Sequence, residues 1–544
     1  MLKRVFCSVF AASMALMGVA GEIFDFTYQG QTLAYEVIDG KTCRVNNGAE
    51  CKGKVEIPAT AVFDNSELNV VEIGSRAFEQ SRITDVIIPD GVVTIGDSAF
   101  WFCNHLEQVA FGSSISSIGE EAFSQCNELK ELNLPNSLKE IGRSAFKYCT
   151  SLTEVKIPDE VVSIGADAFY CCFISSASIG KSVSEIGSGA FYYCNRLTKA
   201  EFGSIESLCN IKFNDYSSNP LYYAHHLYID GAEVNEIVVP SSVTGLLPNV
   251  FYGGSALTKI ELGNSITSIG AEAFRDCSGL KNMEIPNSVM TIGENAFSSC
   301  KNLASLKLPD GLTSISAELC SNCTNLTDVN IPVQVKTIGK KAFYGCSITT
   351  VHIPDNVTTI GADAFCNCAK LEEVTFGRDL KEIGDYAFSG CYKLTRADML
   401  PGLTKIGERV FMSCVNLSSI TIPYSVTTIG QNAFESCLGL REIYCNIEKP
   451  FDFTSGIDSY LYDVTVLYIP KGTLDAYRQI NAWKNFKNIK DTLADVEDAL
   501  INESDASVEV YNLNGVRVAD STAGLAKGVY IVRRGSIITK IAVK

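Results

Sequence analysis

Residues 118–129 read Ile118-Gly119-Glu120-Glu121-Ala122-Phe123-Ser124-Gln125-Cys126-Asn127-Glu128-Leu129, and residues 429–440 give a second clear copy of the same phrase. Its general form is I-G-x-x-A-F-x-x-C-x-x-L-x-x-V-x-I-P-x-x-V-x-x. With one exception, the glycine position recurs every 22 or 23 residues through fifteen units, at Gly74, Gly96, Gly119, Gly142, Gly165, Gly187, a degenerate Leu247, Gly270, Gly293, Ser316, Gly339, Gly361, Gly384, Gly407 and Gly430.

This period predicts a right-handed leucine-rich-repeat solenoid of the α/β class, because repeats of roughly 20 to 29 residues with leucine-type positions build such stacks. In the unit at residues 129–152, the alternation at Leu132 to Leu134 predicts a short strand, which Pro135 ends. The spacing of Ala145, Phe146 and Cys149 predicts a short helical or 3₁₀ turn behind the strand. One unit cannot bury its own apolar edge, so neighbouring units must cover it.

The cysteines follow the same register. Of 21 cysteines, thirteen occupy the A-F-x-x-C position: Cys103, Cys126, Cys149, Cys172, Cys194, Cys277, Cys300, Cys323, Cys346, Cys368, Cys391, Cys414 and Cys437. We favour a column of buried thiols over disulfides or a metal ladder, because in-register side chains lie about 4.8 Å apart and are not turned toward each other. Gly254 replaces one member of the column, which a packing position tolerates. Pairing of Cys43 with Cys51, which lie outside the column, is left open.

The amino-terminal end predicts export. A charged start at Lys3 and Arg4, an apolar run from Val5 to Met17 and small residues at 18–21 indicate a signal peptide at residues 1–20. Residues 21–72 lack the full phrase, and the alternating segments 24–28 and 33–37 predict a hairpin in a β cap. The solenoid then spans residues 73–445, with an insert near 205–243.

After the solenoid, residues 446–490 predict a closing cap. Its predicted helix spans residues 474–486, where Tyr477 and Trp483 would plug the last coil. Residues 491–505 are acidic and predict a linker. Residues 506–544 predict a small all-β module, with strands near 508–518, 528–532 and 539–544 and an Asn514-Gly515 turn.

The repeated phrase resembles that of the BspA-like leucine-rich repeat surface proteins of bacteria, and the residues from Asn219 to Ile229 look like a recurring interruption in that family. The tail, with V-Y-N-L-N-G-x-R-V, G-V-Y-I-V and a closing Val-Lys, is similar to the sorting domains read by type IX secretion, although it is shorter than most. These resemblances imply a protein that is secreted or displayed on the cell surface, outside the outer membrane. They also imply adhesion to host matrix proteins or to partner cells.

No pattern indicates catalysis, a cofactor or a metal site. The chain has four histidines, His105, His225, His226 and His352, without a metal-ligand spacing, and it has no phosphate-binding glycine loop. The formal charge of −17 disfavours nucleic acid, which requires a basic surface. The apolar run of the signal peptide is too short to span a bilayer and no other stretch approaches that length, so no integral membrane span is predicted.

A candidate binding patch lies between the phenylalanine and cysteine positions of the early units and in the insert, at Trp101, Phe102, Tyr148, Tyr170, Tyr192, Tyr193, Tyr222 and Tyr223. Two interpretations stay open: the insert folds down on these rings, or they form an exposed patch of the kind enriched at interfaces. The functional prediction is therefore a non-catalytic adhesion protein that binds an extracellular protein ligand. The alternative is a structural or glycan-capturing protein of the cell surface.

Overall fold

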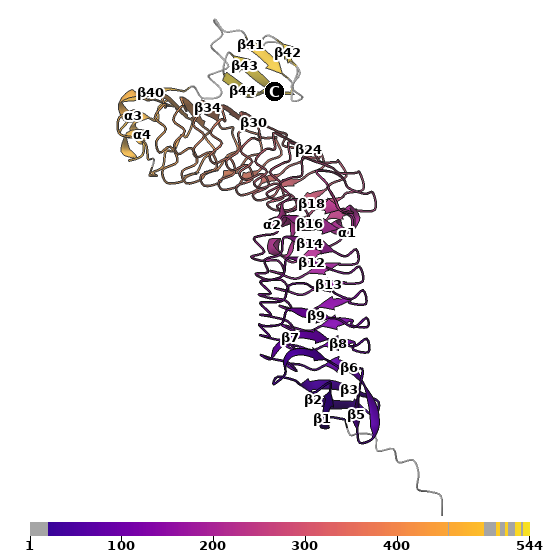
Figure 1. The fold of residues 1–544 in the computed structure, drawn as a ribbon. Coiled ribbons are helices and arrows are strands. Elements are labelled where there is room, and N and C mark those ends of the chain that lie inside the picture. The colour runs from indigo at the N-terminus through magenta and orange to yellow at the C-terminus, as the bar shows by residue number, and fades with distance from the viewer. Residues whose placement is uncertain are drawn as a thin grey trace, which may run out of the picture.

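The computed structural model describes residues 20–454, 456–493, 508–511, 517–519, 528–534 and 537–543. The chain winds into a long solenoid whose coils stack one on the next (Figure 1). Coils contribute a short strand before the repeat glycine and a second strand after the repeat leucine. The predicted solenoid is therefore confirmed.

The short strands form one series: β8 (Thr94–Ile95), β10 (Ser117–Ile118), β11 (Glu140–Ile141), β13 (Ser163–Ile164), β15 (Glu185–Ile186), β17 (Lys212–Phe213), β21 (Gly245–Leu246), β23 (Ser268–Ile269), β25 (Thr291–Ile292), β27 (Ser314–Ile315), β29 (Thr337–Ile338), β31 (Thr359–Ile360), β33 (Glu382–Ile383), β35 (Lys405–Ile406) and β37 (Thr428–Ile429). The second series comprises β4 (Lys52–Glu56), β7 (Arg82–Ile87), β9 (Gln108–Ala110), β12 (Glu154–Lys156), β14 (Ser176–Ile179), β16 (Lys199–Phe202), β18 (Leu227–Ile229), β20 (Glu236–Val238), β22 (Lys259–Glu261), β24 (Asn282–Glu284), β26 (Ser305–Lys307), β28 (Asp328–Val329), β30 (Thr350–His352), β32 (Glu373–Thr375), β34 (Arg396–Asp398), β36 (Ser419–Ile422) and β38 (Glu442–Cys445).

Paired strands of neighbouring coils run parallel and in register, so Ile118 pairs with Ile95 on one side and Ile141 on the other. The strand predicted at Leu132 to Leu134 is absent. Leu132 is nevertheless buried, so this segment of the coil stays in place by side-chain packing. The repeat glycine serves close packing between coils. A Cβ at Gly142 would lie 2.5 Å from the carbonyl carbon of Gly119, which no side chain allows.

The segment after the glycine is not the helical or 3₁₀ turn that the sequence predicted. In the unit of Gly142, Ser144 and Tyr148 have left-handed φ angles of 52° and 61°. The N–H of Phe146 donates to the carbonyl of Ala168 in the next coil at 2.8 Å, whereas the N–H of Cys149 closes a turn onto Phe146 at 3.2 Å. The prediction was wrong because the next coil offers backbone acceptors that compete with those inside a helix.

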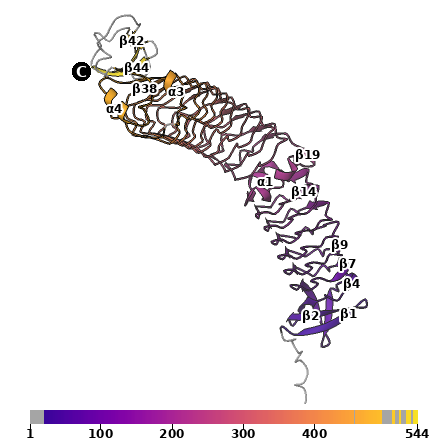
Figure 2. The same cartoon turned by 90° about the vertical axis from the view of Figure 1, so that its left-hand side faces the viewer.

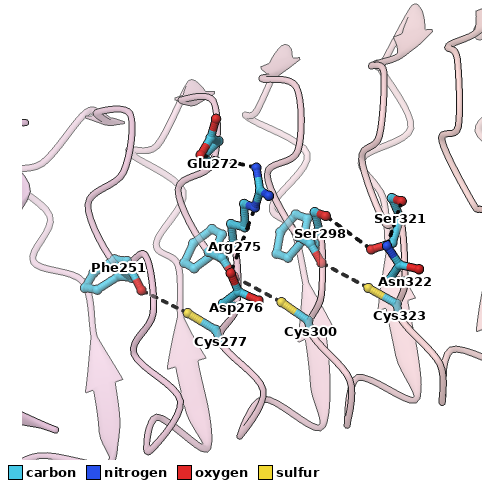
Figure 3. Close-up of polar contacts among 12 residues, drawn as sticks. Phe251, Glu272, Arg275, Asp276, Cys277, Ser298, Cys300, Ser321, Asn322 and Cys323 are labelled. Atoms are coloured by element: carbon cyan, nitrogen blue, oxygen red, sulfur yellow. Dashed lines mark hydrogen bonds and ion pairs between the residues drawn. The ribbon is translucent and has the colours of Figure 1, made fainter. Parts of the chain in front are cut away.

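Two ladders of side chains fill the core behind these turns. The rings of Phe100, Phe123 and Phe146 are nearly parallel, with centroids 4.9 Å and 5.4 Å apart. The predicted column of thirteen thiols is buried, and each thiol donates to a backbone carbonyl of the preceding coil at 2.9–3.3 Å. Figure 3 shows this bond from Cys277 to Phe251 and its repetition in the next coils. The cysteine therefore supplies a small apolar group that also satisfies a buried carbonyl.

The spacing exception between Gly187 and Leu247 contains an additional, enlarged coil. Here β17 pairs with β15 and β18 pairs with β16, and the loops between them form α1 (Ile205–Cys209), η1 (Tyr216–Ser218) and α2 (Leu221–Ala224). The strand β19 (Ala232–Glu233) then pairs antiparallel with β18, so neither series continues across it. Beside these elements the solenoid changes direction and divides into an amino-terminal and a carboxy-terminal arm (Figures 1 and 2).

The two arms join through side chains of the insert. Asn219 is fully buried, and its amide donates to the carbonyls of Asn249 at 2.8 Å and Val250 at 3.1 Å. The ring of His225 donates from Nδ1 to the carbonyl of Gly253 at 2.9 Å. These bonds replace the interrupted strand pairing, so the insert holds the bend in place.

The amino-terminal cap contains the predicted hairpin. Strands β1 (Ile23–Tyr28) and β2 (Gln31–Asp39) pair antiparallel, followed by β3 (Thr42–Asn47), β5 (Thr60–Phe63) and β6 (Ser66–Ile73). Cys43 and Cys51 are both buried free thiols here. Because β3 pairs with β6 in parallel, coiling begins before the first full phrase.

The carboxy-terminal cap contains α3 (Leu461–Val464), β39 (Val466–Pro470), α4 (Leu474–Gln479) and β40 (Asn488–Leu493). The helix is shorter than predicted, but Tyr477 and Trp483 are buried as expected, and the hydroxyl of Tyr477 donates to the carbonyl of Ile447 at 2.7 Å. The strand β40 includes the first residues of the predicted linker; residues 494–507 lie outside the described chain.

In the tail, four antiparallel strands are described: β41 (Val508–Tyr511), β42 (Arg517–Ala519), β43 (Gly528–Arg534) and β44 (Ile537–Val543). The predicted Asn514-Gly515 turn lies outside the described residues.

Candidate functional site

Each turn segment carries two neighbouring residues between the buried phenylalanine and the buried cysteine, and in several units these residues lie at the surface. We call this surface the turn face. In the unit of Phe146, Lys147 and Tyr148 occupy these two positions. The N–H of Tyr148 donates to the carbonyl of Tyr170 at 2.9 Å, so the backbone that carries the ring is fixed to the next coil.

Six of the eight predicted patch residues come together on the turn face at the bend. Tyr170 contacts Tyr148 and Tyr193, with ring centroids 5.4 Å and 5.8 Å apart and edges directed at faces. Tyr192 lies 4.3 Å from Tyr193. The insert completes this aromatic cluster, because Tyr222 contacts Tyr223 at 4.7 Å and the hydroxyl of Tyr223 accepts a hydrogen bond from the N–H of Tyr193 at 3.0 Å.

Trp101 and Phe102 form a separate pair, with ring centroids 5.5 Å apart. The coil between this pair and Tyr148 carries Ser124 and Gln125, so one coil without aromatic rings interrupts the predicted patch.

The eight residues differ in exposure. Phe102, Tyr148 and Tyr193 are 38%, 37% and 45% exposed. The other five are half-buried: Trp101, Tyr170, Tyr192, Tyr222 and Tyr223. The insert therefore folds onto part of the cluster but leaves the ring of Tyr193 open to solvent, a combination of the two interpretations.

The sequence analysis missed two tyrosines of this region. Tyr216 and Tyr252 contact Tyr222, at 5.0 Å and 5.2 Å. The guanidinium of Arg275 lies 5.6 Å from the centre of the Tyr252 ring and 3.5 Å from a carboxylate oxygen of Glu272, as Figure 3 shows for the ion pair. Tyr252 could have been found, because it directly follows the repeat phenylalanine, Phe251.

The electrostatics of the cluster favour protonated tyrosines. Burial raises the pKa of Tyr223 to about 12 and also raises the pKa of Tyr252 and Tyr170. Lys147 lies 4.6 Å from the centre of the Tyr170 ring, a cation–π contact. At neutral pH these rings therefore offer apolar faces and hydroxyl hydrogen-bond donors.

The face that carries the second series of strands is polar, with ion pairs between coils such as that of Lys307 in β26 with Glu284 in β24 at 2.5 Å. It is not free of aromatic residues throughout. Tyr444 and Tyr468 stack at 4.7 Å at its carboxy-terminal end, and the ammonium of Lys490 lies 5.2 Å from the centre of the Tyr468 ring.

The four histidines are dispersed along the described chain. His105 lies 3.8 Å from Glu128, His226 lies 2.7 Å from Glu233, and Nδ1 of His352 lies 2.6 Å from the hydroxyl of Thr375. Within the described residues, no group of three or more histidine, cysteine, aspartate or glutamate side chains is placed to hold a metal ion. None of the described helices has the length and apolarity needed to cross a bilayer.

The family comparison matches a model described as a BspA-type leucine-rich repeat region to residues 71–218, 226–347 and 336–452, more than half of the chain. The unmatched residues 219–225 contain α2 of the insert. Among curated proteins there is no match.

Several solved structures resemble the chain. A leucine-rich repeat protein from Bacteroides ovatus is 26% identical, the match covers 83% of this chain and 99% of that one, and the TM-score is 0.47. A leucine-rich repeat protein from Eubacterium ventriosum is 22% identical, with coverages of 76% and 95% and a TM-score of 0.39. A leucine-rich cell surface protein from Faecalibacterium prausnitzii is 23% identical, with coverages of 78% and 94% and a TM-score of 0.32.

Proposed function

The chain belongs to the BspA-type leucine-rich repeat family, and we propose that it is a non-catalytic adhesion protein that binds an extracellular protein through the turn face. A solenoid offers a long surface that its own folding does not use. The exposed rings of Phe102, Tyr148 and Tyr193 supply the aromatic anchors that protein interfaces favour. Matrix proteins and the surfaces of partner cells are the ligand classes that the family resemblance favours.

One observation carries this proposal. Phe102, Tyr148 and Tyr193 have left-handed backbones, with φ of 58°, 61° and 61°. A left-handed backbone costs a bulky L-residue about 1–2 kcal/mol. All the other units place a small or polar residue at the same position, namely Gln80, Gln125, Cys171, Gly253, Asp276, Ser299, Asn322, Gly345, Asn367, Gly390, Ser413 and Ser436. An exposed ring at such a position lowers the stability of the fold, and residues with a strained backbone cluster at binding sites.

The test is the binding of the purified full chain to a panel of matrix proteins and glycans. In the variant Phe102→Asn, Tyr148→Asn and Tyr193→Asn, each ring becomes a residue that tolerates the left-handed backbone. We expect the triple variant to fold and to lose roughly tenfold or more in affinity. The matched control is Tyr392→Asn with Tyr424→Asn, which removes two rings that are 47% and 61% exposed in the other arm. Equal affinity of the triple variant and the parent would refute the proposal.

A structural or glycan-capturing role, with the ligand in the insert, is the second candidate. It is less favoured because Tyr216, Tyr222 and Tyr252 pack against one another, which leaves few ring faces for sugar stacking. Binding of glycans from the panel without binding of any protein would favour this candidate.

We also propose that the protein is exported in two steps, by the signal peptide at residues 1–20 and then by the tail at residues 506–544 acting as a sorting domain. The resemblance of both segments to export signals supports this proposal. Deletion of residues 506–544 should leave the protein inside the cell. The measurement is protease accessibility on intact cells, and normal surface display of the deletion would reduce the tail to a passive end.

A further inference from the structure

The exposed rings of the turn face alternate from coil to coil. The second turn-face position holds Phe102, Gln125, Tyr148, Cys171 and Tyr193 in five successive coils. The three aromatic side chains are exposed, whereas Gln125 and Cys171 are half-buried. A ring therefore stands out on every second coil.

This alternation sets a spacing that a ligand must match. The buried phenylalanine rings of these five coils lie 4.9–5.5 Å apart, so alternate rings repeat at roughly 10 to 11 Å. A polyproline II helix has three residues per turn and a rise of about 3.1 Å, so one of its faces repeats every 9.3 Å or so. Side chains on one face of a β-strand repeat at about 6.8 Å, which does not fit the rings.

An α-helix also repeats a face at about 10.5 Å, from residue i to i+7. However, its apolar face includes residues i+3 and i+4, and at the first interval these would lie over the polar side chain of Gln125. A polyproline II segment has no such halfway residue on the same face. The alternation of ring and smaller side chain thus favours the polyproline II conformation.

The chemistry of the cluster suits the same ligand. Proline-rich segments dock on aromatic surfaces as preformed polyproline II helices, and their backbone carbonyls have no internal hydrogen-bond partner. Between Tyr148 and Tyr193, the ring of Tyr170 lies beside both of them, at 5.4 Å and 5.8 Å. Protonated tyrosine hydroxyls on this surface can donate to the carbonyls of the ligand.

The coil between the first two rings carries acidic side chains, and one lysine, Lys147, lies 5.7 Å from the centre of the Tyr148 ring. Glu121 and Glu128 lie on the coil between Phe102 and Tyr148. The nearby cations are already engaged, since Arg143 lies 3.8 Å from Glu120 and Lys147 lies 3.8 Å from Asp167. A ligand that meets this end of the row should therefore carry basic residues.

We propose that Phe102, Tyr148 and Tyr193 bind a proline-rich segment of a partner protein in the polyproline II conformation, with lysine or arginine at the end that meets Glu121 and Glu128. This inference rests on the proposed function, because it names the partner of the same surface. The three rings span four coil intervals, which corresponds to about seven proline residues.

The full chain is titrated with a synthetic peptide that begins with Lys-Arg and continues with about seven prolines. Isothermal titration calorimetry measures the affinity. Two peptides serve as comparisons: one with Glu-Glu in place of Lys-Arg, and one with alternating threonine and valine in place of proline. We expect the basic proline peptide to bind, the acidic one to bind about tenfold more weakly, and the threonine-valine peptide not to bind.

The decisive variant moves one ring by one coil. Phe102→Gln combined with Gln125→Phe keeps the composition of the surface but destroys the alternation. This exchange variant should bind the proline peptide about tenfold or more weakly than the parent, whereas Tyr392→Asn should leave the affinity unchanged. Equal binding by this exchange variant and the parent would overturn the inference, as would failure of the basic proline peptide to bind.

The failure of the inference can be told apart from failure of the proposed function. One outcome would refute only the polyproline II partner: a matrix protein binds to the parent chain but not to the triple asparagine variant, and the proline peptide does not bind to the parent. The turn face would then remain the binding surface.

Discussion

The hydroxyl of Tyr223 takes the place of a backbone carbonyl for Tyr193. In the units of Phe102, Gln125, Tyr148 and Cys171, the N–H of this turn-face position donates to a carbonyl of the next coil at 2.7–2.9 Å. After Tyr193 the next coil is the insert, and the phenolic oxygen of Tyr223 accepts the bond at 3.0 Å. The insert thus continues the backbone ladder with a side chain and holds the last exposed ring of the row.

This relationship predicts that Tyr223→Phe destabilises the amino-terminal arm. The N–H of Tyr193 would exchange this partner for water, because the bond is exposed, at a net cost of about 0.5–1.5 kcal/mol. Denaturant unfolding gives the free energy, and hydrogen exchange should be faster at the amide of Tyr193. The control is Tyr222→Phe, and equal stability of the two variants would speak against a role for the Tyr223 hydroxyl.

The repeat glycines and the left-handed positions should respond in opposite ways to substitution. Gly119→Ala places a Cβ 2.7 Å from the backbone nitrogen of Asp97, so we expect a loss of about 2–3 kcal/mol or more. Glu121, in the same unit, has a φ of 55°. The substitution Glu121→Gly relieves the strain of this left-handed backbone but raises the entropy of the unfolded chain, and the two effects oppose each other. The stability of this variant should therefore stay within about 1 kcal/mol of that of the parent. Similar losses in both variants, measured by denaturant unfolding, would contradict the assigned role of the glycine.

The thiol column predicts that the solenoid is sensitive to alkali. Burial raises the pKa of Cys368 and Cys437 to about 12 and that of Cys391 well above its usual range, whereas an unfolded thiol titrates near 8.5 or so. The folded state then keeps protons that the unfolded state loses. The stabilisation is complete below about pH 8.5 and falls by about 1.4 kcal/mol per thiol and pH unit as the pH rises toward the folded pKa.

The measurement is the free energy of unfolding between about pH 8 and 10, above and below the pKa of unfolded cysteine. Replacing Cys368, Cys391 and Cys437 with alanine should reduce the slope by about 4 kcal/mol per pH unit. Gly254, which stands in the same column, indicates that the position tolerates a smaller residue. An unchanged slope would mean that these thiols ionise equally well in the folded chain.

The phenylalanine ladder predicts a large cost for Phe297→Ala. Its ring is fully buried and lies 5.0 Å from that of Phe274, so truncation should cost about 3–5 kcal/mol in unfolding experiments. The matched control is Phe102→Ala, which removes an exposed ring and should change stability by no more than about 0.5 kcal/mol. A loss within error of zero at Phe297 would argue against its burial.

The repeated phrase predicted the coils and the burial of the cysteine column, and the alternation of residues 24–28 and 33–37 predicted the amino-terminal hairpin, because each depends on local spacing. It could not distinguish the turns from a helix, since Ala145, Phe146 and Cys149 have the same apolar spacing in both. Asparagine and aspartate at positions such as Asn322 and Asp167 were the available signal for left-handed backbone.

The candidate site was only partly predictable for a different reason. The sequence identified which residues are aromatic, but their exposure depends on which of the two turn-face positions they occupy. Tyr148 holds the second position and is exposed, whereas Tyr170 holds the first position and is half-buried. The bond between Tyr193 and Tyr223 joins residues that are 30 positions apart through a side chain, which no repeat register reveals.

The most direct test of the turn face as the binding surface uses Cys171. It lies on the coil between Tyr148 and Tyr193 and is half-exposed, whereas the other described cysteines are buried. Its alkylation by iodoacetamide can be followed by mass spectrometry on the full chain, alone and saturated with the tightest-binding matrix protein of the panel. Our account predicts that alkylation of Cys171 is slowed strongly in the complex, because the ligand covers the rings on either side. An unchanged rate at saturation would place the ligand elsewhere on the solenoid and contradict the account.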